Sequence, residues 1–273
     1  MDSMMREEYA TLKLGDFSEE EVAVVEELIT TINLNNPVSF SSWGSVSDGA
    51  GAIDEVSGAI EGSPVSRLSA KLAEIVESMK TADPRILAKK PSWLSRKLGF
   101  AVEARVKYKV ARKGIDEDIQ EATTLEGDVR DALEKMSSML VSHRERSNTI
   151  RLHLAAGHLY LSRNPDAGKP DQAEMMFEDN RARFTRRLAN LATLLTSHGM
   201  TEVQLRLGRS SGFDMLDRFV QLTQVLVPVW RQHTLSLISA THEDPELVAA
   251  ASRAHDALMA GLASSVNADH TSH

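Results

Sequence analysis

Three arginines near the middle of the chain form the sharpest charged feature of the sequence. Arg183, Arg186 and Arg187 stand in the stretch RARFTRR. On a helix they fall within about one third of the circumference, opposite the apolar residues Phe184 and Leu188. Such a cluster could hold an oxyanion or a lipid phosphate. It could also be a solvated helix face paired with acids of a neighbouring helix, and we favour this second interpretation because exposed ion pairs are common.

A second stretch, KKPSWLSRKLGF, combines basic side chains with an aromatic one. Its candidate binding residues are Lys89, Lys90, Trp93, Arg96 and Lys97. A basic, aromatic segment could rest on an anionic membrane surface. The alternative, which we favour, is a hinge whose tryptophan packs on the protein itself.

The sequence offers no recognisable catalytic machinery. Of the nine histidines, His153 and His158 are five apart and diverge on a helix, whereas metal-binding pairs sit three or four apart. His143 occupies a position expected to be packed, so we interpret it as a packed polar residue and not as a ligand. There is no cysteine, which excludes disulfides and thiolate chemistry, and no phosphate-binding loop or nucleophile elbow. We expect no catalytic residue, no metal, no cofactor and no enzymatic activity.

Composition favours a helical protein that does not bind nucleic acid. Hydrophobic residues make up 42% of the 273 residues and aromatic residues only 5%, and strong helix formers dominate the middle of the chain. The net charge of −8 opposes general nucleic-acid binding, which requires a basic surface. The N-terminus lacks the apolar core of a signal peptide, and no run approaches the roughly 20 apolar residues of a membrane span. We expect a cytoplasmic protein, with peripheral contact at the inner membrane left open by the Trp93 segment.

Hydrophobic periodicity predicts an all-α fold, an elongated helical bundle with a coiled-coil-like antiparallel hairpin of long helices. After a loose leader over 1–16, Ser18 and Glu21 form a capping box at the start of a first helix. A Ser/Gly-rich connection with at most a short helix over 48–60 leads to a second helix, which begins at Ser63–Pro64 and ends at Asp83–Pro84. The predicted divisions are 1–63, 64–100, the long helical bundle 101–263 and a disordered tail 264–273.

The hairpin is predicted from a heptad seam that runs from about Val102 to Ser162. After a loop, Asp171 caps a return helix that Gly199 ends, and further helices cover Phe213–Leu237 and about 244–262. The expected core consists of Leu133, Met136, Leu140, Phe184, Leu188 and Leu191.

The stretch VPVWRQHTLSL, residues 227–237, places a proline inside an apolar helical pattern. Proline lacks a backbone N–H and crowds the carbonyl four residues back, here that of Gln224. Two interpretations stay open. Pro228 kinks one long helix and so aims Trp230 into the hairpin, or a new helix begins at Pro228.

Several segments taken together resemble one protein family. They are FSEEEV, SSWGSVSDGAGAIDEVSGAI, VSRLSAKLAEIVESMKTADPRIL, the basic WLSRKLG and VQLRLGRSSGFDMLDRFVQLTQVLVPVWRQHTLSL. In this order they are similar to the TelA family of toxic-anion (tellurite) resistance proteins, also called the KlaA type. The resemblance covers about residues 40–238, and its most specific part is Pro228, Trp230 and Gln232. The sequence departs from the pattern at Gly208, where glutamine is common, and in its short region after Ala240.

The resemblance implies a bacterial or plasmid-borne protein that helps to resist tellurite and other stresses, and it supplies no catalytic residue. We therefore expect a non-catalytic helical interaction or scaffold protein whose partners are other stress-resistance proteins, with an anionic membrane as a further contact. The alternative is a protein that binds or detoxifies the oxyanion directly through the arginine cluster. The sequence does not specify an oligomeric state.

Overall fold

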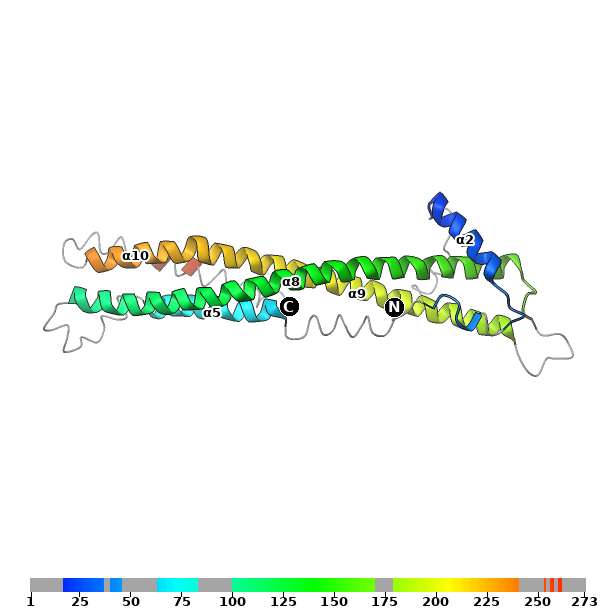
Figure 1. Cartoon of the computed structure of the whole chain (residues 1–273), viewed down its shortest axis with the longest axis horizontal. Helices are drawn as coiled ribbons and strands as arrows, with labels where there is room; N and C mark the ends of the chain where they lie inside the picture. Colours follow the sequence, from blue (N-terminus) through cyan, green and yellow to red (C-terminus); the bar gives the residue numbers. More distant parts are fainter. Residues whose placement is uncertain are drawn as a thin grey trace. The chain divides into compact units, whose positions relative to one another are not determined.

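The fold is described by a computed structural model that covers residues 17–36, 40–45, 63–82, 100–169 and 179–240, with 253, 256, 257, 260 and 261. All regular structure in these residues is helical, without a strand, which confirms the predicted all-α helical bundle. The elements in chain order are α2 (Glu19–Thr31), α5 (Pro64–Thr81), α8 (Phe100–Arg163), α9 (Asn180–Gln221), the π-helical turn η2 (Leu222–Leu226) and α10 (Val227–Ala240) (Figure 1).

Some predictions fall on residues that the structure does not describe. Of the predicted helix over 244–262, the five described residues are helical. The others outside the described residues are the leader 1–16, the short helix 48–60, the Asp83–Pro84 helix end, the basic segment 89–97, the Asp171 cap and the tail 264–273.

The first two helices begin as the sequence predicts. The Glu21 backbone N–H donates to Ser18 Oγ at 3.2 Å, and the Ser18 N–H donates to the Glu21 carboxylate at 3.0 Å, which completes the capping box. The hydrogen bond from this backbone N–H, followed by the charge of Arg151, lowers the pKa of the Glu21 carboxyl. In α5 the Ser63 hydroxyl accepts from the Val65 N–H, and Pro64 occupies the first turn, where a missing N–H breaks no helical bond.

The predicted interruption after Gly199 is wrong, because α9 continues without a break to Gln221. Gly199 is exposed, and a Cβ at its position would meet nothing within 4 Å. A glycine in such a site costs a helix about 1 kcal/mol relative to alanine, which is too little to end a helix held by a buried face. At the start of α9, Asp179 Oδ1 accepts from the Ala182 N–H at 2.8 Å and caps the helix.

The chain forms two compact units, and each takes part of both long helices. Unit 1 comprises Met1–Gly58 and Met136–Leu207, and unit 2 comprises Ala59–Lys135 and Gly208–His273. The units therefore join segments that are distant in sequence, whereas the division predicted from the sequence runs consecutively along the chain. No helix in the described parts of either unit combines the length and apolar character that crossing a membrane requires.

In unit 1, the C-terminal part of α8 packs antiparallel to the N-terminal part of α9. The two backbones approach closely at Gly157, where a Cβ would lie 2.5 Å from a methyl carbon of Leu188. Phe184 is fully buried and contacts the rings of Phe40 and Trp43 edge-on, with centroids 6.1 and 6.0 Å away.

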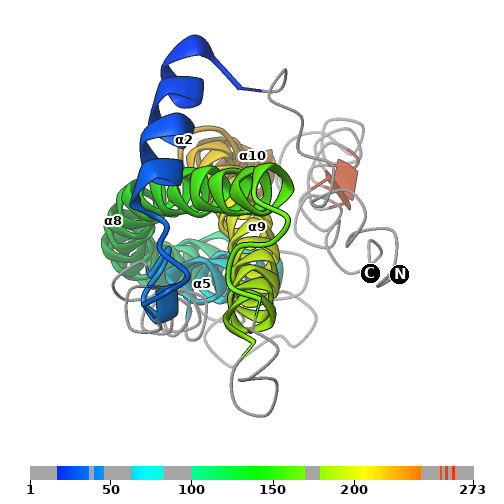
Figure 2. The ribbon, with the colours of Figure 1, turned by 90° about the vertical axis from the view of Figure 1, so that its right-hand side faces the viewer.

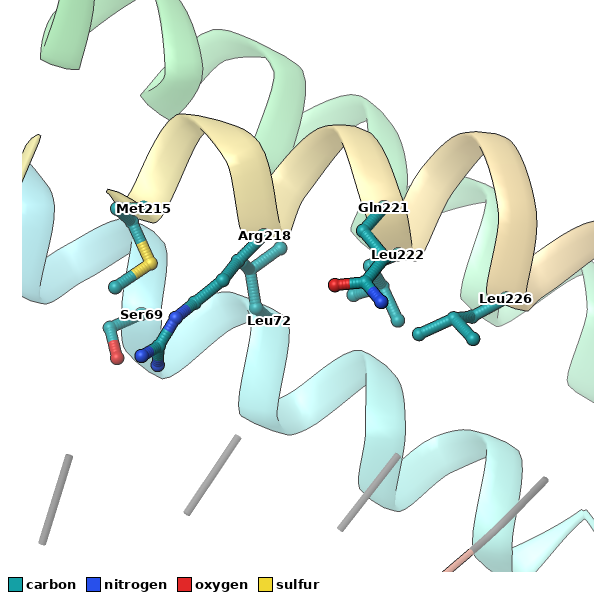
Figure 3. A pocket seen from close by; sticks show the side chains of 7 residues that line it. All are labelled: Ser69, Leu72, Met215, Arg218, Gln221, Leu222 and Leu226. Carbon is teal, nitrogen blue, oxygen red and sulfur yellow. The ribbon is translucent and has the colours of Figure 1, made fainter. Parts of the chain in front are cut away.

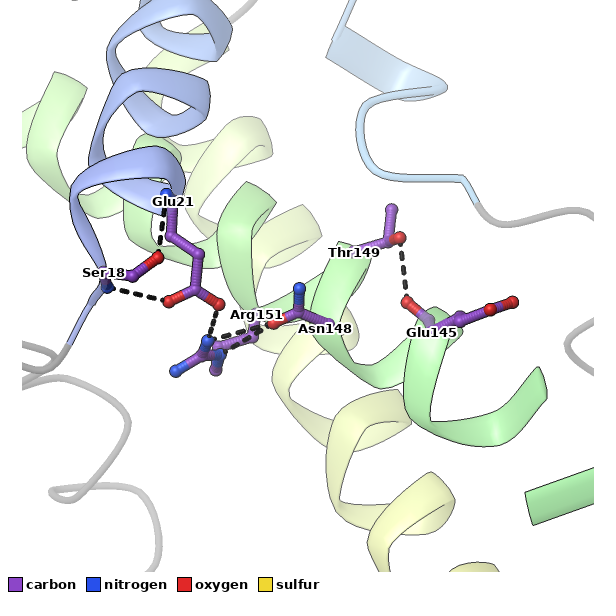
Figure 4. A network of polar contacts seen from close by, with 6 residues as sticks. All are labelled: Ser18, Glu21, Glu145, Asn148, Thr149 and Arg151. Atoms are coloured by element: carbon purple, nitrogen blue, oxygen red, sulfur yellow. Dashed lines mark hydrogen bonds and ion pairs between the residues drawn. The ribbon is translucent and has the colours of Figure 1, made fainter. Parts of the chain in front are cut away.

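The helix α2 is fastened to α8 in unit 1 by charged side chains. The Arg151 guanidinium pairs with the Glu21 carboxylate of the capping box, beside Asn148 (Figure 4). Arg163 donates two hydrogen bonds of 2.7 Å to Glu26. These contacts agree with Figure 2, in which α2 lies across α8.

In unit 2, α5 supplies a third helix to the N-terminal part of α8 and the end of α9. Arg67 pairs with Asp128 at 3.0 Å, and Lys71, further along α5, pairs with Glu121 at 2.8 Å. This order shows that α5 runs antiparallel to α8. The apolar face of α5 is buried, and the core of the unit includes Leu68, Leu72, Ile75, Met79, Ile115, Ala122, Val129, Met215, Leu222 and Trp230.

The predicted core of the long helices is confirmed. All six positions are buried, with exposed fractions between 0% and 6%: Leu133, Met136, Leu140, Phe184, Leu188 and Leu191.

Candidate functional site

Pro228 follows an irregular turn inside an otherwise continuous helical run. The Val227 N–H donates to the Leu222 carbonyl, five residues back, which defines the π-helical turn η2. Because proline cannot donate to Gln224 and its ring crowds that carbonyl, a wider turn at this point relieves the conflict. The chain is helical on both sides, so the structure places a π turn where the sequence left a kink or a helix start open.

The π turn also keeps the buried face in register. Leu222 and Val227 are both buried although they are five residues apart, whereas successive core residues of a regular helix are three or four apart. The wider turn absorbs the extra residue. Trp230 and Thr234 then follow on the same buried face.

Trp230 is fully buried, and its indole N–H donates to the Met79 carbonyl at 3.2 Å. Met79 lies in the last turn of α5, where helix carbonyls have no partner within their own helix. The Tyr108 ring of α8 lies 5.8 Å away. The indole is therefore both buried and hydrogen-bonded, and its acceptor belongs to α5. Pro228 and Gln232, which share the family pattern, are exposed.

Charged side chains surround the edge of this tryptophan site. Asp116 of α8 pairs with Arg231 and lies 3.7 Å from Arg112. Burial raises the pKa of the Tyr108 hydroxyl, which has no hydrogen-bond partner within the described residues. The arrangement holds α10 against α8 without forming an evident catalytic group.

Next to it, the end of α5 and the N-terminal part of α8 form an open groove of about 510 Å³. Val106 and Val110, one helical turn apart on α8, are 57% and 69% exposed there. The residues that line the groove are Ser78, Thr81, Ala82, Val106, Lys107, Val110, Ala111, Gly114, Ile115 and Asp118. Because Trp230 binds the carbonyl of Met79, it fixes the turn of α5 that forms one wall.

A second hollow in unit 2 lies between α5, the end of α9 and η2 (Figure 3). Its volume is about 20 Å³, and Ser69, Leu72, Arg218 and Gln221 are among its lining residues. A space of this size holds about one water molecule. It is too small for a substrate.

The arginine cluster lies in unit 1, and two of its members bind the segment 40–45. Arg187 donates from Nε to the Trp43 carbonyl and from a terminal nitrogen to Ser45 Oγ, both at 2.8 Å. The Arg183 guanidinium lies over the Phe40 ring, 5.6 Å from its centroid, and Arg186 is exposed. These contacts give the cluster a role in holding the N-terminal part of unit 1.

A fourth arginine of the same stretch was missed by the sequence analysis. Arg181 donates to the carbonyls of Leu161 and Asn164, at 2.9 and 2.7 Å, and so binds the C-terminal end of α8. Carbonyls at a helix end attract cationic side chains. An arginine shortly after the predicted loop could therefore have been predicted to bind the end of the preceding helix.

His143 is buried as predicted, and it contacts a second buried histidine on α9. The Nδ1 atoms of His143 and His198 are 2.9 Å apart. This partner was not predicted from the sequence, because the return helix was expected to end at Gly199, next to His198. Residues roughly equidistant from the connection of an antiparallel hairpin face each other, and this relation could have paired them. Among the described residues no three His, Cys, Asp or Glu side chains could together hold a metal ion.

Comparison with known proteins gives one clear relative. Protein KlaA of Escherichia coli is 42% identical over 231 residues, which cover 85% of this chain and 90% of the relative. The chain belongs to the KlaA family. No protein-family model and no solved structure matches it. The KlaA-type kinship that the sequence segments indicated is thereby confirmed.

Proposed function

We propose that this KlaA-family protein acts in bacterial resistance to tellurite and related toxic anions, as a non-catalytic helical scaffold that binds another resistance protein. The resemblance of its sequence segments to toxic-anion resistance proteins supports a role in resistance. The open groove between α5 and α8 supports the mode of action. The partner that fits it is an amphipathic helix with apolar residues at helical spacing.

The exposed valines are the observation that carries this proposal. Val106 and Val110 present apolar surface at an i, i+4 spacing beside the shallow wall of α5. A partner helix laid along such a groove removes this surface from water, and each 100 Å² of apolar surface buried contributes about 2.5 kcal/mol. Lys107 and Asp118 line the same groove and supply opposite charges that can orient the partner.

Two further observations favour binding over catalysis. The described part of the chain brings together no set of three metal donors. Arg183 and Arg187 are engaged with the protein's own residues 40–45, which argues against a site for a free oxyanion at the cluster.

The experiment compares two variants in cells that depend on the protein for growth in tellurite. Replacing Val106 and Val110 with glutamate should abolish resistance while the abundance and melting temperature of the protein stay unchanged. The matched control is Val141→Glu, since Val141 lies on α8 in unit 1 and is also 57% exposed. Full resistance in the groove variant, or equal loss in both, would overturn the proposal.

The membrane contact suggested by the basic segment has its own test. In a flotation experiment with anionic liposomes, the protein should rise together with the liposomes. The variant in which Lys89, Lys90, Arg96 and Lys97 are changed to glutamate should stay in the dense fraction. Direct handling of the anion is tested by calorimetry with tellurite in thiol-free buffer, where we expect no heat of binding at millimolar anion.

A further inference from the structure

The buried histidine pair of unit 1 has a geometry that depends on its protons. The two rings lie with centroids 5.1 Å apart, and the exposed fractions are 2% for His143 and 1% for His198. For two Nδ1 atoms to form a hydrogen bond at 2.9 Å, one must carry a proton and the other must offer its lone pair. Two neutral rings of different tautomers meet this condition, and two imidazolium rings cannot.

The surroundings offer the His198 ring little compensation for a positive charge. On α8, the charged neighbours in sequence are Arg144, Glu145 and Arg146. On α9 the nearest acid along the helix is Glu202, and its carboxylate is already shared by Arg144, at 2.9 Å, and Arg206. Leu140 and Leu195 are buried one turn away on either helix.

The second nitrogen of His198 adds to this cost. Its Nε2 is buried and has no hydrogen-bond partner within the described residues. Burial, then the charges of His143 and Arg146, lower the pKa of the His198 imidazole below its ordinary value of 6.5. A proton on this ring is therefore disfavoured by its position between the helices.

We propose that His143 and His198 form a proton-sensitive lock, which keeps α8 and α9 of unit 1 closed at neutral pH and releases them in acid. A single proton leaves one N–H to donate and one lone pair to accept between the two Nδ1 atoms, whereas charging both rings removes the acceptor lone pair and breaks the contact. Protonation of both rings places two N–H groups and two positive charges face to face. Separation of the helices at this point lets water reach the rings.

The direction of the pH dependence follows from the lowered pKa. In the open state the His198 ring takes up a proton at the ordinary imidazole value, whereas in the closed state the same ring resists it. Closure is therefore fully stable above pH 6.5 and loses stability as the pH falls from there toward the lowered value. Over this window, each linked proton favours opening by about tenfold per pH unit.

Hydrogen exchange of the full chain, followed by mass spectrometry in the presence of a chelator, tests the lock. After correction for intrinsic rates, protection of peptides covering 139–147 and 194–202 should fall by about tenfold per pH unit below 6.5. Peptides of α5 in unit 2 provide an internal reference and should change less. Equal protection of the lock peptides at pH 7.5 and 5.5 would overturn the proposal.

Two variants test whether the acid sensitivity comes from the His143–His198 pair or from another histidine. In His198→Gln the amide can still accept a hydrogen bond but does not titrate, so the acid sensitivity of these peptides should disappear. His158→Gln is the matched control, because burial lowers the pKa of His158 in the same unit. It should leave the sensitivity intact, and its loss there would contradict the lock.

A titration of the unaltered protein provides an answer even if His198→Gln does not fold. Histidine rings labelled with both carbon and nitrogen isotopes can be followed by nuclear magnetic resonance, with His143 and His198 assigned by single substitution. A resonance of the pair that titrates below 6.5, together with ring nitrogen shifts of two different neutral tautomers, supports the lock. Both rings titrating independently at the ordinary value would refute it.

Discussion

The two units bury their apolar residues in different ways. Unit 2 is a set of helices with repeating apolar faces, in which α5 lies along α8 and receives the indole of Trp230. Within its described residues, unit 1 has two long helical segments, and short N-terminal elements complete its core through the rings of Phe40 and Trp43. The difference shows that a regular face suffices to dock a long helix, whereas short elements need individual side chains to hold them.

Charged side chains mark the same contrast. In unit 1, Arg151, Arg163 and Arg187 each reach from a long helix to an N-terminal element. In unit 2, Glu121 and Glu74 hold Lys71 and raise its pKa, but this ion pair lies beside an extensive apolar contact. Loss of a single contact should therefore release a larger share of the N-terminal elements in unit 1 than of α5 in unit 2.

The largest expected effect is at Trp230. Trp230→Ala should lower the free energy of unfolding of unit 2 by about 3–5 kcal/mol, since a fully buried indole is removed. Trp230→Phe keeps most of the ring and leaves the Met79 carbonyl without its donor, which should cost about 1–3 kcal/mol. Segment-resolved hydrogen exchange should place both losses in unit 2. An unchanged melting temperature of the alanine variant would show that the ring is not a core residue.

Leu188→Ala is the corresponding change in unit 1. The side chain is 1% exposed and lies against Gly157, so we expect a loss of about 2–5 kcal/mol, measured by denaturant unfolding. The loss of protection should include α2, because Val25 of α2 belongs to the same core as Leu188. A change below about 0.5 kcal/mol would mean that the two helices do not pack through this residue.

Glycine positions sharpen the comparison because each unit offers a close approach between long helices and an open helical site. A Cβ at Gly157 or Gly212 would lie 2.5 or 2.6 Å from a leucine methyl carbon of the opposite helix, whereas Gly199 and Gly127 have nothing within 4 Å. Alanine at the close sites should cost about 1–3 kcal/mol through overpacking, partly offset by better helix propensity. Alanine at the open sites should stabilise by up to about 1 kcal/mol. Thermal melting of the four variants tests this, and the same sign at all four would contradict it.

The smallest expected effects are at the helix caps. Ser18→Ala removes the capping box of α2, and Ser63→Ala removes the cap of α5; each should cost about 1 kcal/mol. In unit 1 this loss should be visible as faster exchange throughout α2, because few contacts hold that helix. In unit 2 it should stay within the first turn of α5. Equal spread in both helices would remove the distinction between the units.

Sequence patterns predicted the long helices well because their cores repeat. The spacing of Leu133, Met136 and Leu140 on α8, and of Phe184, Leu188 and Leu191 on α9, reflects burial on one helix face. The capping box of Ser18 and Glu21 and the proline at position 64 marked two helix starts correctly, because both signals are local. The prediction that Gly199 ends the helix was wrong, because the free-energy cost of a glycine in a helix is smaller than the stabilisation from the buried residues of α9.

The groove and the histidine pair were less accessible to the sequence. The contact between Trp230 and Met79 joins residues 151 positions apart, and no periodicity encodes which carbonyl an indole meets. Pro228 indicated an irregularity in the helix at this point. The five-residue step from Leu222 to Val227 could be recognised only from the structure, which shows that both side chains are buried. His143 was identified as packed, while its partner required the register of the two helices.

The long sequence separations in unit 1 have a consequence for how the chain is made. Glu21 and Glu26 meet their arginines 130 and 137 residues later, and Trp43 meets Arg187 after 144 residues. At about 5–20 residues per second, a ribosome needs roughly 7–30 s to synthesise that interval. During this time the apolar rings of Phe40 and Trp43 have left the ribosome without their binding surface. The nascent chain should therefore be a client for chaperones that shield apolar segments until the second long helix emerges.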